Sequence, residues 1–489
     1  MTTDPLRQAR SLAQPPTGAG PTPWRSVAIH GGALGVWVLL FLMAFSSGGV
    51  LAWSVGVVYV SYDTLLLVFV AWQTLPLRRL RRPPGTGPLA EPAADIAGRP
   101  AATLAVLVAA HNEATVLPVT IAALLAQQLP PDRIVVVDDG STDDTGALLT
   151  GRYGVPATGV GRASEAGLLY PSLRWLRLPH GGKAVALNAA LPLVDCDIVL
   201  TVDGDTLLEP GAIAAVRRAF ADEPQLMIAT GVVTPVCKPT LQGRLFQWFQ
   251  TYEYLRNFLS RYAWMRKDSL LLISGAFAAY RRAELMAVGG FDSASLVEDY
   301  ELTHRMRRHA VLNGLDWRVR VLGDARAITD APASLGAFLR QRRRWFGGFL
   351  QTQYRYREMV GDRRYGSVGL LMLPVKAIDT LQPLYGLTAF GLLVWDLASG
   401  RVSLLAAAGA VIGIKLLIDL AFHLWSIHLY RGWAGGRGRV HFLHGLLAAL
   451  AEPFTFQLLR HLGAALGWVM FFTGRGGWGR QSRHAGLGD

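Results

Sequence analysis

Long apolar segments near both ends of the chain constrain its fold more than any other feature of the sequence. Each is long enough for a helix of about 20 residues, which crosses roughly 30 Å of hydrocarbon. The segments are Val27–Phe45, Val50–Leu77, Val368–Leu397, Val402–Leu429 and Val440–Phe472. The stretch between the second and third segments has ordinary globular composition, with alternating strand and helix patterns. The sequence therefore predicts a globular domain held between membrane helices.

Basic residues gather beside these apolar segments, as expected for the cytosolic loops of a membrane protein. The clusters are Arg78, Arg79, Arg81 and Arg82; Arg340 and Arg342–Arg344; and Arg431, Arg437 and Arg439. We therefore expect the globular domain in the cytosol. A cleaved signal peptide ending at the small residues Ser46–Gly49 would place that domain outside the cell, and we disfavour it. The globular part has no basic stripe interleaved with aromatics, so we expect no nucleic-acid partner.

The composition divides the chain into consecutive parts. They are a disordered cytosolic tail (1–26), two membrane helices (27–77), a linker (78–98), the globular domain (99–332), amphipathic interface helices (333–364), membrane helices (365–474) and a cytosolic tail (475–489). Val440–Phe472 is too long for one span, contains Pro453 and has arginines on both flanks. We expect a hairpin or re-entrant pair broken at Pro453, with both ends in the cytosol. Cys196 and Cys237 indicate neither a metal cluster nor a disulfide framework.

The most informative motif inside the globular domain is an apolar run, Ile198–Val202, that ends in Asp203 and Asp205. It has the composition of a buried strand. In an open α/β sheet, ligands bind beyond the carboxyl ends of the strands, so both carboxylates point into that crevice. Two such oxygen ligands with open positions suit Mg²⁺ or Mn²⁺. The alternative is a solvated Asp-Gly-Asp turn.

Polar residues also follow the other predicted strands. The strand Leu104–Ala109 precedes His111 and Glu113, Ile134–Val137 precedes Asp138 and Asp139, and Arg174–Leu178 precedes Gly181, Gly182 and Lys183. Two glycines before a helix bring backbone N–H groups close to an anion, and Lys183 adds a charge for phosphate. Ser141 is a predicted helix N-cap, with Asp143 and Asp144 in the first turn. Because strands alternate with helices, we expect a doubly wound, mostly parallel sheet.

The second half of the domain carries three further motifs. The helix Leu241–Tyr262 is rich in aromatics, which suit either the core or the headgroup level of a bilayer. Glu298 and Asp299 begin another helical pattern, where capping alone is the alternative role. A later helical segment places Gln341, Arg344 and Trp345 on one face. A neighbouring apolar face suits the membrane surface, with Arg342 intruding into it; its members are Phe338, Phe346, Phe349 and Leu350.

Together these motifs resemble the membrane-integrated family 2 glycosyltransferases, the processive group that includes cellulose, hyaluronan and poly-N-acetylglucosamine synthases. That family has an early Asp pair, a D-x-D, a T-E-D and a Q-x-x-R-W, in that order. The matching residues are Asp138-Asp139, Asp203-Gly204-Asp205, Val297-Glu298-Asp299 and Gln341-Arg342-Arg343-Arg344-Trp345. Val297 replaces the Thr of T-E-D, and His111 stands where the family often has Tyr beside the uracil.

The resemblance implies a GT-A-like fold and a role for each matching residue. Asp139 would contact uracil, Lys183 and Arg344 would stabilise the diphosphate, and His111, Glu113, Asp138, Asp203 and Gln341 would complete the donor site. Asp205, helped by Asp203, would hold Mg²⁺ or Mn²⁺. Asp299, beside Glu298, would be the general base, and Trp345 would stack on the acceptor sugar.

The function that follows is an inverting, processive β-glycosyltransferase. It would polymerise sugar from UDP-GlcNAc or UDP-glucose onto a growing polysaccharide, in a multi-pass protein of the bacterial inner membrane with a cytosolic catalytic domain. Coupling to translocation and accessory envelope proteins stay open. The alternatives are transfer of a single sugar to a membrane lipid, and an inactive sugar-nucleotide-binding scaffold or transporter.

Overall fold

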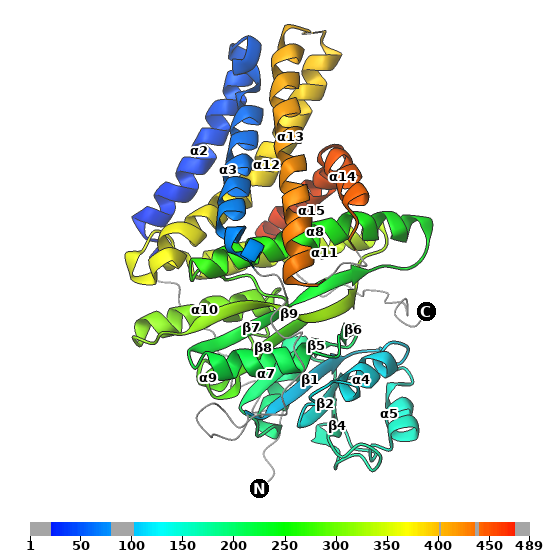
Figure 1. Cartoon of the computed structure of the whole chain (residues 1–489). Helices are drawn as coiled ribbons and strands as arrows, with labels where there is room; N and C mark the ends of the chain where they lie inside the picture. Colours follow the sequence, from blue (N-terminus) through cyan, green and yellow to red (C-terminus); the bar gives the residue numbers. More distant parts are fainter. Residues whose placement is uncertain (1–20, 80–101, 401, 436–439, 475–489) are drawn as a thin grey trace.

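The computed structural model describes residues 21–79, 102–400, 402–435 and 440–474. It places a globular α/β part against one end of a group of long helices (Figure 1). The predicted C-terminal tail, most of the predicted N-terminal tail and most of the linker lie outside the described residues. So do Arg81, Arg82, Arg437 and Arg439.

The predicted membrane segments form long helices. They are α2 (Trp24–Ser46), α3 (Ser54–Thr74), α12 (Leu373–Ala398) and α13 (Val402–Trp433). Four helical stretches among the described residues are long and apolar enough to cross a membrane: Trp24–Ser46, Leu51–Arg79, Val368–Ala398 and Ala406–Trp433. Their exposed leucines, valines and aromatics fit a lipid environment.

The last apolar segment is broken at the predicted place. Helices α14 (Phe442–Ala451) and α15 (Phe456–Thr473) flank a single turn, η7 (Glu452–Phe454), and the chain bends there by 49°. Pro453 lies in this turn, where it interrupts the backbone hydrogen bonding of a continuous helix. The membrane topology of this pair stays a prediction.

The globular part contains one nine-stranded sheet, in the order β3-β4-β2-β1-β5-β8-β7-β9-β6. Six strands (β4, β2, β1, β5, β7 and β9) point the same way, and β3, β8 and β6 run opposite to them. This arrangement confirms the predicted mostly parallel sheet. The strands are β1 (Leu104–Ala110), β2 (Arg133–Asp139), β3 (Arg162–Ala163), β4 (Leu173–Leu178), β5 (Ile198–Asp203), β6 (Thr206–Leu208), β7 (Leu226–Val236), β8 (Phe277–Arg281) and β9 (Arg318–Asp330).

Shorter helices connect the strands of this sheet. They are α4 (Leu117–Leu125), α5 (Thr145–Tyr153), α6 (Lys183–Ala190), α7 (Ala212–Asp222), α9 (Arg282–Ala287) and α10 (Glu298–Leu312). The central strands β1, β2 and β5 are buried along almost their whole length, as expected for parallel strands covered on both faces. Single turns complete the chain: η1 (Gly49–Trp53), η2 (Leu75–Arg79), η3 (Leu191–Leu193), η4 (Arg357–Met359), η5 (Arg363–Tyr365) and the π-turn η6 (Val368–Met372).

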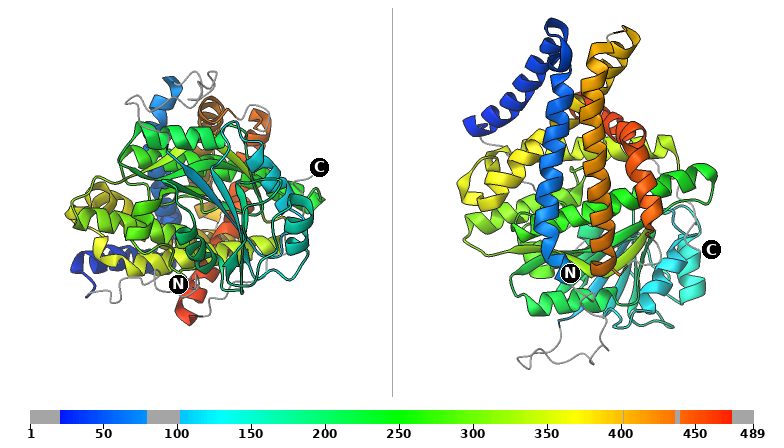
Figure 2. Two further views of the ribbon diagram at one scale, coloured as in Figure 1. Left: turned by 90° about the horizontal axis from the view of Figure 1, so that it is seen from below. Right: turned by 45° about the horizontal axis from the view of Figure 1, so that its top comes forward.

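Two long helices, α8 (Leu241–Arg266) and α11 (Leu335–Arg355), lie between the sheet and the membrane helices (Figures 1 and 2). Most of the aromatic side chains of α8 are buried, including Phe246, Phe249 and Phe258. The core role of these aromatics, rather than the headgroup role, therefore fits the structure.

The apolar face of α11 is covered in part by protein, since Phe338 and Leu350 are buried, and its place at the membrane surface stays a prediction. Phe338 is fully buried and packs its ring against Phe246 and Phe456. Helix α15 approaches so closely that a Cβ at Gly467 would lie 2.9 Å from the backbone nitrogen of Gly347. Contacts with α8 and α15 therefore fix the position of α11.

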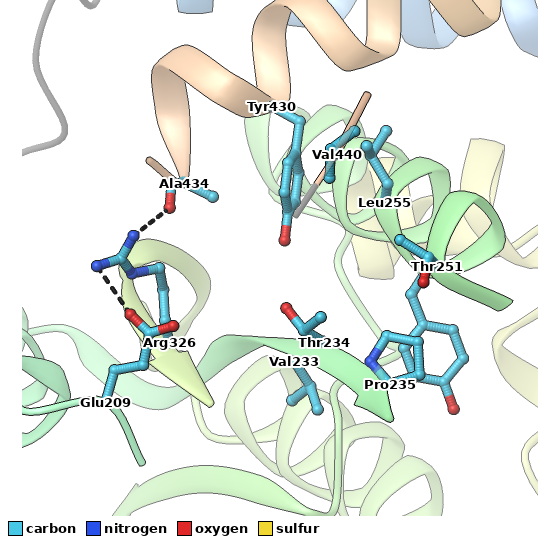
Figure 3. Close-up of a pocket in the computed structure, with 11 residues that line it drawn as sticks. Glu209, Val233, Thr234, Pro235, Thr251, Leu255, Arg326, Tyr430, Ala434 and Val440 are labelled. Atoms are coloured by element: carbon cyan, nitrogen blue, oxygen red, sulfur yellow. Dashed lines mark hydrogen bonds and ion pairs between the residues drawn. The ribbon is translucent and has the colours of Figure 1, made fainter. Parts of the chain in front are cut away.

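Figure 3 shows how the edge of the sheet meets the end of α13. Arg326 of β9 pairs with Glu209 at 2.8 Å and donates a hydrogen bond to the carbonyl oxygen of Ala434, also at 2.8 Å. The adjoining pocket, lined in part by Tyr430 and Leu255, has a volume of about 30 Å³. That volume holds about one water molecule. Arg326 therefore joins β9 to the end of α13 without a large cavity between them.

Candidate active site

The predicted site residues of the first half of the domain lie at one edge of the sheet. His111, Asp139, Lys183 and Asp203 follow or end the neighbouring strands β1, β2, β4 and β5. Parallel strands deliver their carboxyl ends to the same edge, and ligands bind there. The structure therefore brings these residues together at one edge of the sheet, as the strand pattern predicted; their role in a site stays a prediction.

Lys183 lies at the centre of this edge. Its Nζ atom is 2.6 Å from Oδ1 of Asp203 and 3.2 Å from Oε1 of Glu298, and it donates a hydrogen bond to the carbonyl oxygen of Gly275 at 3.2 Å. Burial opposes the charge, but Asp203 and Glu298 outweigh it and raise the pKa of Lys183. Lys183 therefore stays charged and links the Asp-Gly-Asp strand to α10.

Glu298 and Asp299 begin α10 and have opposite pKa shifts. Burial acts to raise the pKa of Glu298, but Lys183 and Arg344 overcome it and lower that pKa. Burial and the adjacent Glu298 raise the pKa of Asp299 to about 6. Neighbouring carboxylates with divergent pKa values mark acid and base roles. Because Glu298 pairs with Lys183, capping of the helix does not account for this motif.

Asp205 lies in a concentration of negative charge. Its side chain is buried, and burial together with Asp203 and Asp330 raises its pKa to about 8. Asp330 ends β9, and its backbone N–H lies 3.3 Å from the carbonyl oxygen of Asp205. A concentration of carboxylate charge attracts a divalent cation. Sequence reasoning missed Asp330, although it has the same signal: a carboxylate at the end of a strand.

Glu113 lies beneath the Asp-Gly-Asp turn. It is buried, and a Cβ at Gly204 would collide with its carboxylate. The hydroxyl of Thr120 donates to the carbonyl oxygen of Gly204 at 2.7 Å. This packing places Glu113 behind the backbone that carries Asp203 and Asp205, where it supports the turn.

The early aspartate pair accepts hydrogen bonds from backbone N–H groups and from the indole of Trp175. Asp138 accepts hydrogen bonds from the Ser141 N–H at 2.8 Å and from Nε1 of Trp175 at 3.2 Å. Asp139 accepts hydrogen bonds from the N–H groups of Gly181 and Gly182, at 2.7 and 2.9 Å. The anion predicted for these glycine N–H groups is therefore the Asp139 carboxylate rather than a phosphate. Gly182 has φ +93°, which favours glycine at this position.

Two histidines extend this part of the site. The rings of His111 and His180 lie 4.4 Å apart, and Nδ1 of each ring hydrogen-bonds to the carbonyl oxygen of Asp139, at 2.8 and 3.1 Å. Ligand atoms of His111, Asp139 and His180 all lie within 4.8 Å of one another. His180 was not predicted as a site residue; its signal was a histidine directly before the two glycines.

Helix α5 begins too far along the chain for Ser141 to be its N-cap residue. Its first residue is Thr145, whose N–H and hydroxyl both donate to Oδ1 of Asp143, at 3.1 and 2.6 Å. The hydroxyl of Ser141 instead accepts the backbone N–H of Asn112 at 3.0 Å. The N-cap prediction for Ser141 was wrong because its side chain binds the loop after β1. Asp143 and Asp144, predicted for the first turn, lie before the helix, and the N-cap residue Asp144 makes no side-chain capping hydrogen bond.

Helix α11 brings its motif next to α10. Arg344 donates a hydrogen bond from Nη1 to the carbonyl oxygen of Leu296 at 2.9 Å. Burial and Lys183 have the largest effects on the pKa of Glu298, and the charge of Arg344 is a further cause that lowers it. Among the described residues, the buried Oε1 of Gln341 has no hydrogen-bond partner. Half-buried Trp345 packs against the cluster that contains Val297.

Arg342 has a structural partner in this region. Its guanidinium lies 4.6 Å from the ring centre of Trp345, and its Nη2 pairs with Oε2 of Glu253 at 2.7 Å. The arginine that interrupts the apolar face is thus paired with a buried carboxylate of α8. Sequence reasoning missed Glu253, because nothing local marks it as the partner of a residue 89 positions away.

Comparisons with known proteins show what this chain is similar to. A family model described as glycosyltransferase like family 2 matches residues 100–348. The chain is 26% identical over 247 residues to a poly-beta-1,6-N-acetyl-D-glucosamine synthase of Staphylococcus aureus, which covers 50% of this chain and 53% of the relative. A relative of the same name from Staphylococcus epidermidis is 24% identical over 245 residues, and this match covers 50% of this chain and 53% of that relative. The chain spans about half the length of the curated relatives it matches.

A solved structure, the mannosyltransferase PcManGT from Pyrobaculum calidifontis in complex with GDP-Man and Mn²⁺, has a TM-score of 0.49 and 20% identity. The similarity covers 82% of this chain and 99% of that one. The family model itself spans every motif from His111 to Trp345, about half of the 489-residue chain. The chain therefore belongs to glycosyltransferase family 2.

Proposed function

We propose that this protein is an inverting, processive β-glycosyltransferase that extends a polysaccharide from a UDP-sugar. The observation that carries the proposal is the cluster of Lys183, Asp203, Glu298 and Asp299 at the carboxyl ends of the parallel strands, with Trp345 on the adjoining helix. The names of the relatives favour UDP-GlcNAc as donor over UDP-glucose.

The donor would bind with its uracil near Asp139 and His111 and its diphosphate near Lys183 and Arg344. These two cations already act together on Glu298. When the bond between the sugar C1 and the diphosphate oxygen breaks, UDP leaves with the electron pair. Cations held in place before the reaction stabilise that developing charge without reorganisation.

The acceptor would be activated by Asp299. The acceptor hydroxyl loses its proton to the Asp299 carboxylate while its oxygen forms a bond to C1 of the donor sugar. A base on the side opposite the leaving group inverts the configuration, so an α-linked donor gives a β-linked product. The pKa of about 6 leaves Asp299 ionised at neutral pH and basic enough to accept the proton.

A divalent cation, Mg²⁺ or Mn²⁺, fits the acidic turn. Asp205 and Asp203 would hold it, with Asp330 adding negative charge nearby. The ion supplies charge neutralisation for the leaving diphosphate. Burial and two neighbouring carboxylates disfavour the ionised form of Asp205 and raise its pKa. A bound cation would offset this repulsion, so the raised pKa supports the assignment.

Chain growth, rather than a single transfer to a lipid, follows from the proposed role of Trp345. A flat ring supports the apolar face of a sugar and lets the product slide forward after each addition. A lipid phosphate acceptor gains little from such a platform. The arginine clusters support a cytosolic catalytic domain at the bacterial inner membrane, with product passing toward the membrane helices.

A donor screen on purified protein in detergent tests the proposal. UDP release and radiolabel incorporation are followed for UDP-GlcNAc and UDP-glucose, with product length resolved on a gel. We expect one donor to give long products. If the wild-type protein makes only a lipid that carries one sugar, the processive function is refuted in favour of single transfer to a lipid. If it transfers no sugar at all, the remaining function is that of a binding scaffold or transporter.

A further inference from the structure

Helix α8 carries a half-buried arginine, Arg261, whose buried guanidinium nitrogens have no protein acceptor among the described residues. Among the described residues, Arg261 makes no hydrogen bond or ion pair, and its Nε and Nη1 atoms are both buried. Its one packing contact of note is the ring of Phe258, 4.5 Å from the guanidinium carbon. A buried charge without partners is costly, so such a group calls for an explanation.

A second arginine of the same helix shows what a structural role looks like. Arg256 donates to Oε2 of Glu452 at 2.6 Å, and its Nη1 lies 2.7 Å from Nε2 of His423. Arg256 thus ties α8 to the membrane helices. Arg261 has no comparable contact, so a structural ion pair does not explain it.

The neighbours of Arg261 place it beside the proposed base. Burial lowers its pKa to about 10, against the opposing effect of Asp299 and Tyr254, so both groups lie within electrostatic reach. Tyr254, Phe258 and Arg261 recur at helical spacing on one face of α8. Arg342, which stacks on Trp345, also acts on Tyr254. This face of α8 therefore lies between the base and the acceptor platform.

The diphosphate side of the site is served by other cations. Lys183 and Arg344 act on Glu298, and Lys183 also acts on Asp299, which is the carboxylate that acts on Arg261. Asp299 is the group that faces the acceptor hydroxyl in the proposed reaction. An oxygen-bearing ligand that reaches Asp299 from the acceptor side would meet the unsatisfied N–H groups of Arg261.

We propose that Arg261 binds the acceptor saccharide by donating hydrogen bonds to an oxygen substituent next to the attacking hydroxyl. This inference rests on the proposed function. The ligand is a neutral sugar whose hydroxyl or acyl carbonyl oxygen accepts those bonds. A guanidinium suits this task because its planar N–H groups are fixed in direction. Arg261 would thereby orient the terminal sugar over Trp345 with its hydroxyl toward Asp299.

The test compares acceptor and donor kinetics in the full-length protein in detergent. The variants are Arg261→Gln and Arg261→Lys, and the matched control is Arg266→Gln, an exposed arginine at the end of the same helix. Three quantities are measured: KM for an added oligosaccharide acceptor, KM for the UDP-sugar, and UDP release without acceptor.

For Arg261→Gln we expect acceptor KM to rise by about 10- to 100-fold, the effect of losing a charged hydrogen bond. Donor KM and acceptor-free UDP release should stay within about twofold of wild type, as should every quantity for Arg266→Gln. Arg261→Lys keeps the charge without the planar geometry and should fall between wild type and Arg261→Gln.

Two outcomes would overturn the inference. A parallel rise in donor KM and fall in acceptor-free UDP release would assign Arg261 to the diphosphate. An unchanged acceptor KM in well-folded Arg261→Gln, judged by its thermal unfolding, would leave only a packing role. Failure of the proposed function itself looks different, because wild-type protein would then transfer no sugar to any saccharide.

Discussion

The pH dependence of transfer is the sharpest test of the role assigned to Asp299. Burial and Glu298 raise the pKa of Asp299 to about 6. The neighbouring charged groups do not titrate in the same range, because Lys183 has a raised pKa and Glu298 a lowered one. The acidic side of the kcat/KM profile should therefore report Asp299.

The size of the effect follows from this pKa. With a pKa of about 6, the fraction of Asp299 that is ionised is about 0.9 at pH 7 and about 0.1 at pH 5. Because only the ionised form accepts the proton, kcat/KM should fall by about tenfold between these values. An ordinary aspartate with a pKa of about 3.9 would stay ionised throughout and give a flat profile.

The assay measures sugar transfer from pH 5 to pH 8 at a saturating, constant concentration of divalent cation. That condition is needed because the pKa of Asp205 is raised to about 8 by burial and by its acidic neighbours. Asp299→Asn should lower transfer by roughly 10²–10⁴-fold and abolish the acidic limb. A flat wild-type profile, or an unchanged limb in the residual activity of Asp299→Asn, would refute the assignment of Asp299 as base.

Four further predictions follow from the structure. Asp205→Asn should abolish turnover in folded protein, as should EDTA with wild type; full activity in either would refute a metal role. Trp345→Ala should lower polymer formation far more than UDP release without acceptor, and intact long products would exclude a platform. Glu253→Gln leaves Arg342 without its buried carboxylate and should destabilise the protein by about 3 kcal/mol in a detergent unfolding assay, whereas an unchanged midpoint would show the pair to be neutral. A cysteine in Ala485→Cys should be labelled only from the cytosolic side; external labelling would refute the hairpin topology.

Parts of the fold were predictable because their signals are local. Strands β1, β2 and β5 are short apolar runs bounded by polar residues, which the buried centre of a parallel sheet requires. Strand β9 was missed, although buried and partly exposed residues alternate along it from Arg318 to Asp330. Its arginines alternate with apolar residues, a period of two that indicates a half-buried strand.

The candidate site was predictable as a set of residues but not as a set of contacts. Carboxylates at strand ends indicate where a site lies, since parallel strands end at one edge. They do not indicate which group each one binds. Asp139 takes the glycine N–H groups expected for a phosphate, and Arg261 is 38 positions from Asp299, with no motif to join them. Contacts of that range depend on how α8 and α10 pack.

Helix α11 shows why the membrane helices and the site have to be considered together. On one side, a Cβ at Gly467 of α15 would lie 2.8 Å from Cβ of Phe346, so the two helices are in close contact. On another side, a Cβ at Gly348 would lie 2.5 Å from Cγ2 of Val297, the residue before Glu298 and Asp299. Closely packed elements move together rather than deform. A tilt of α15 would therefore shift Trp345 and the proposed base as one unit, so the membrane helices help to set the geometry in which the acceptor meets Asp299.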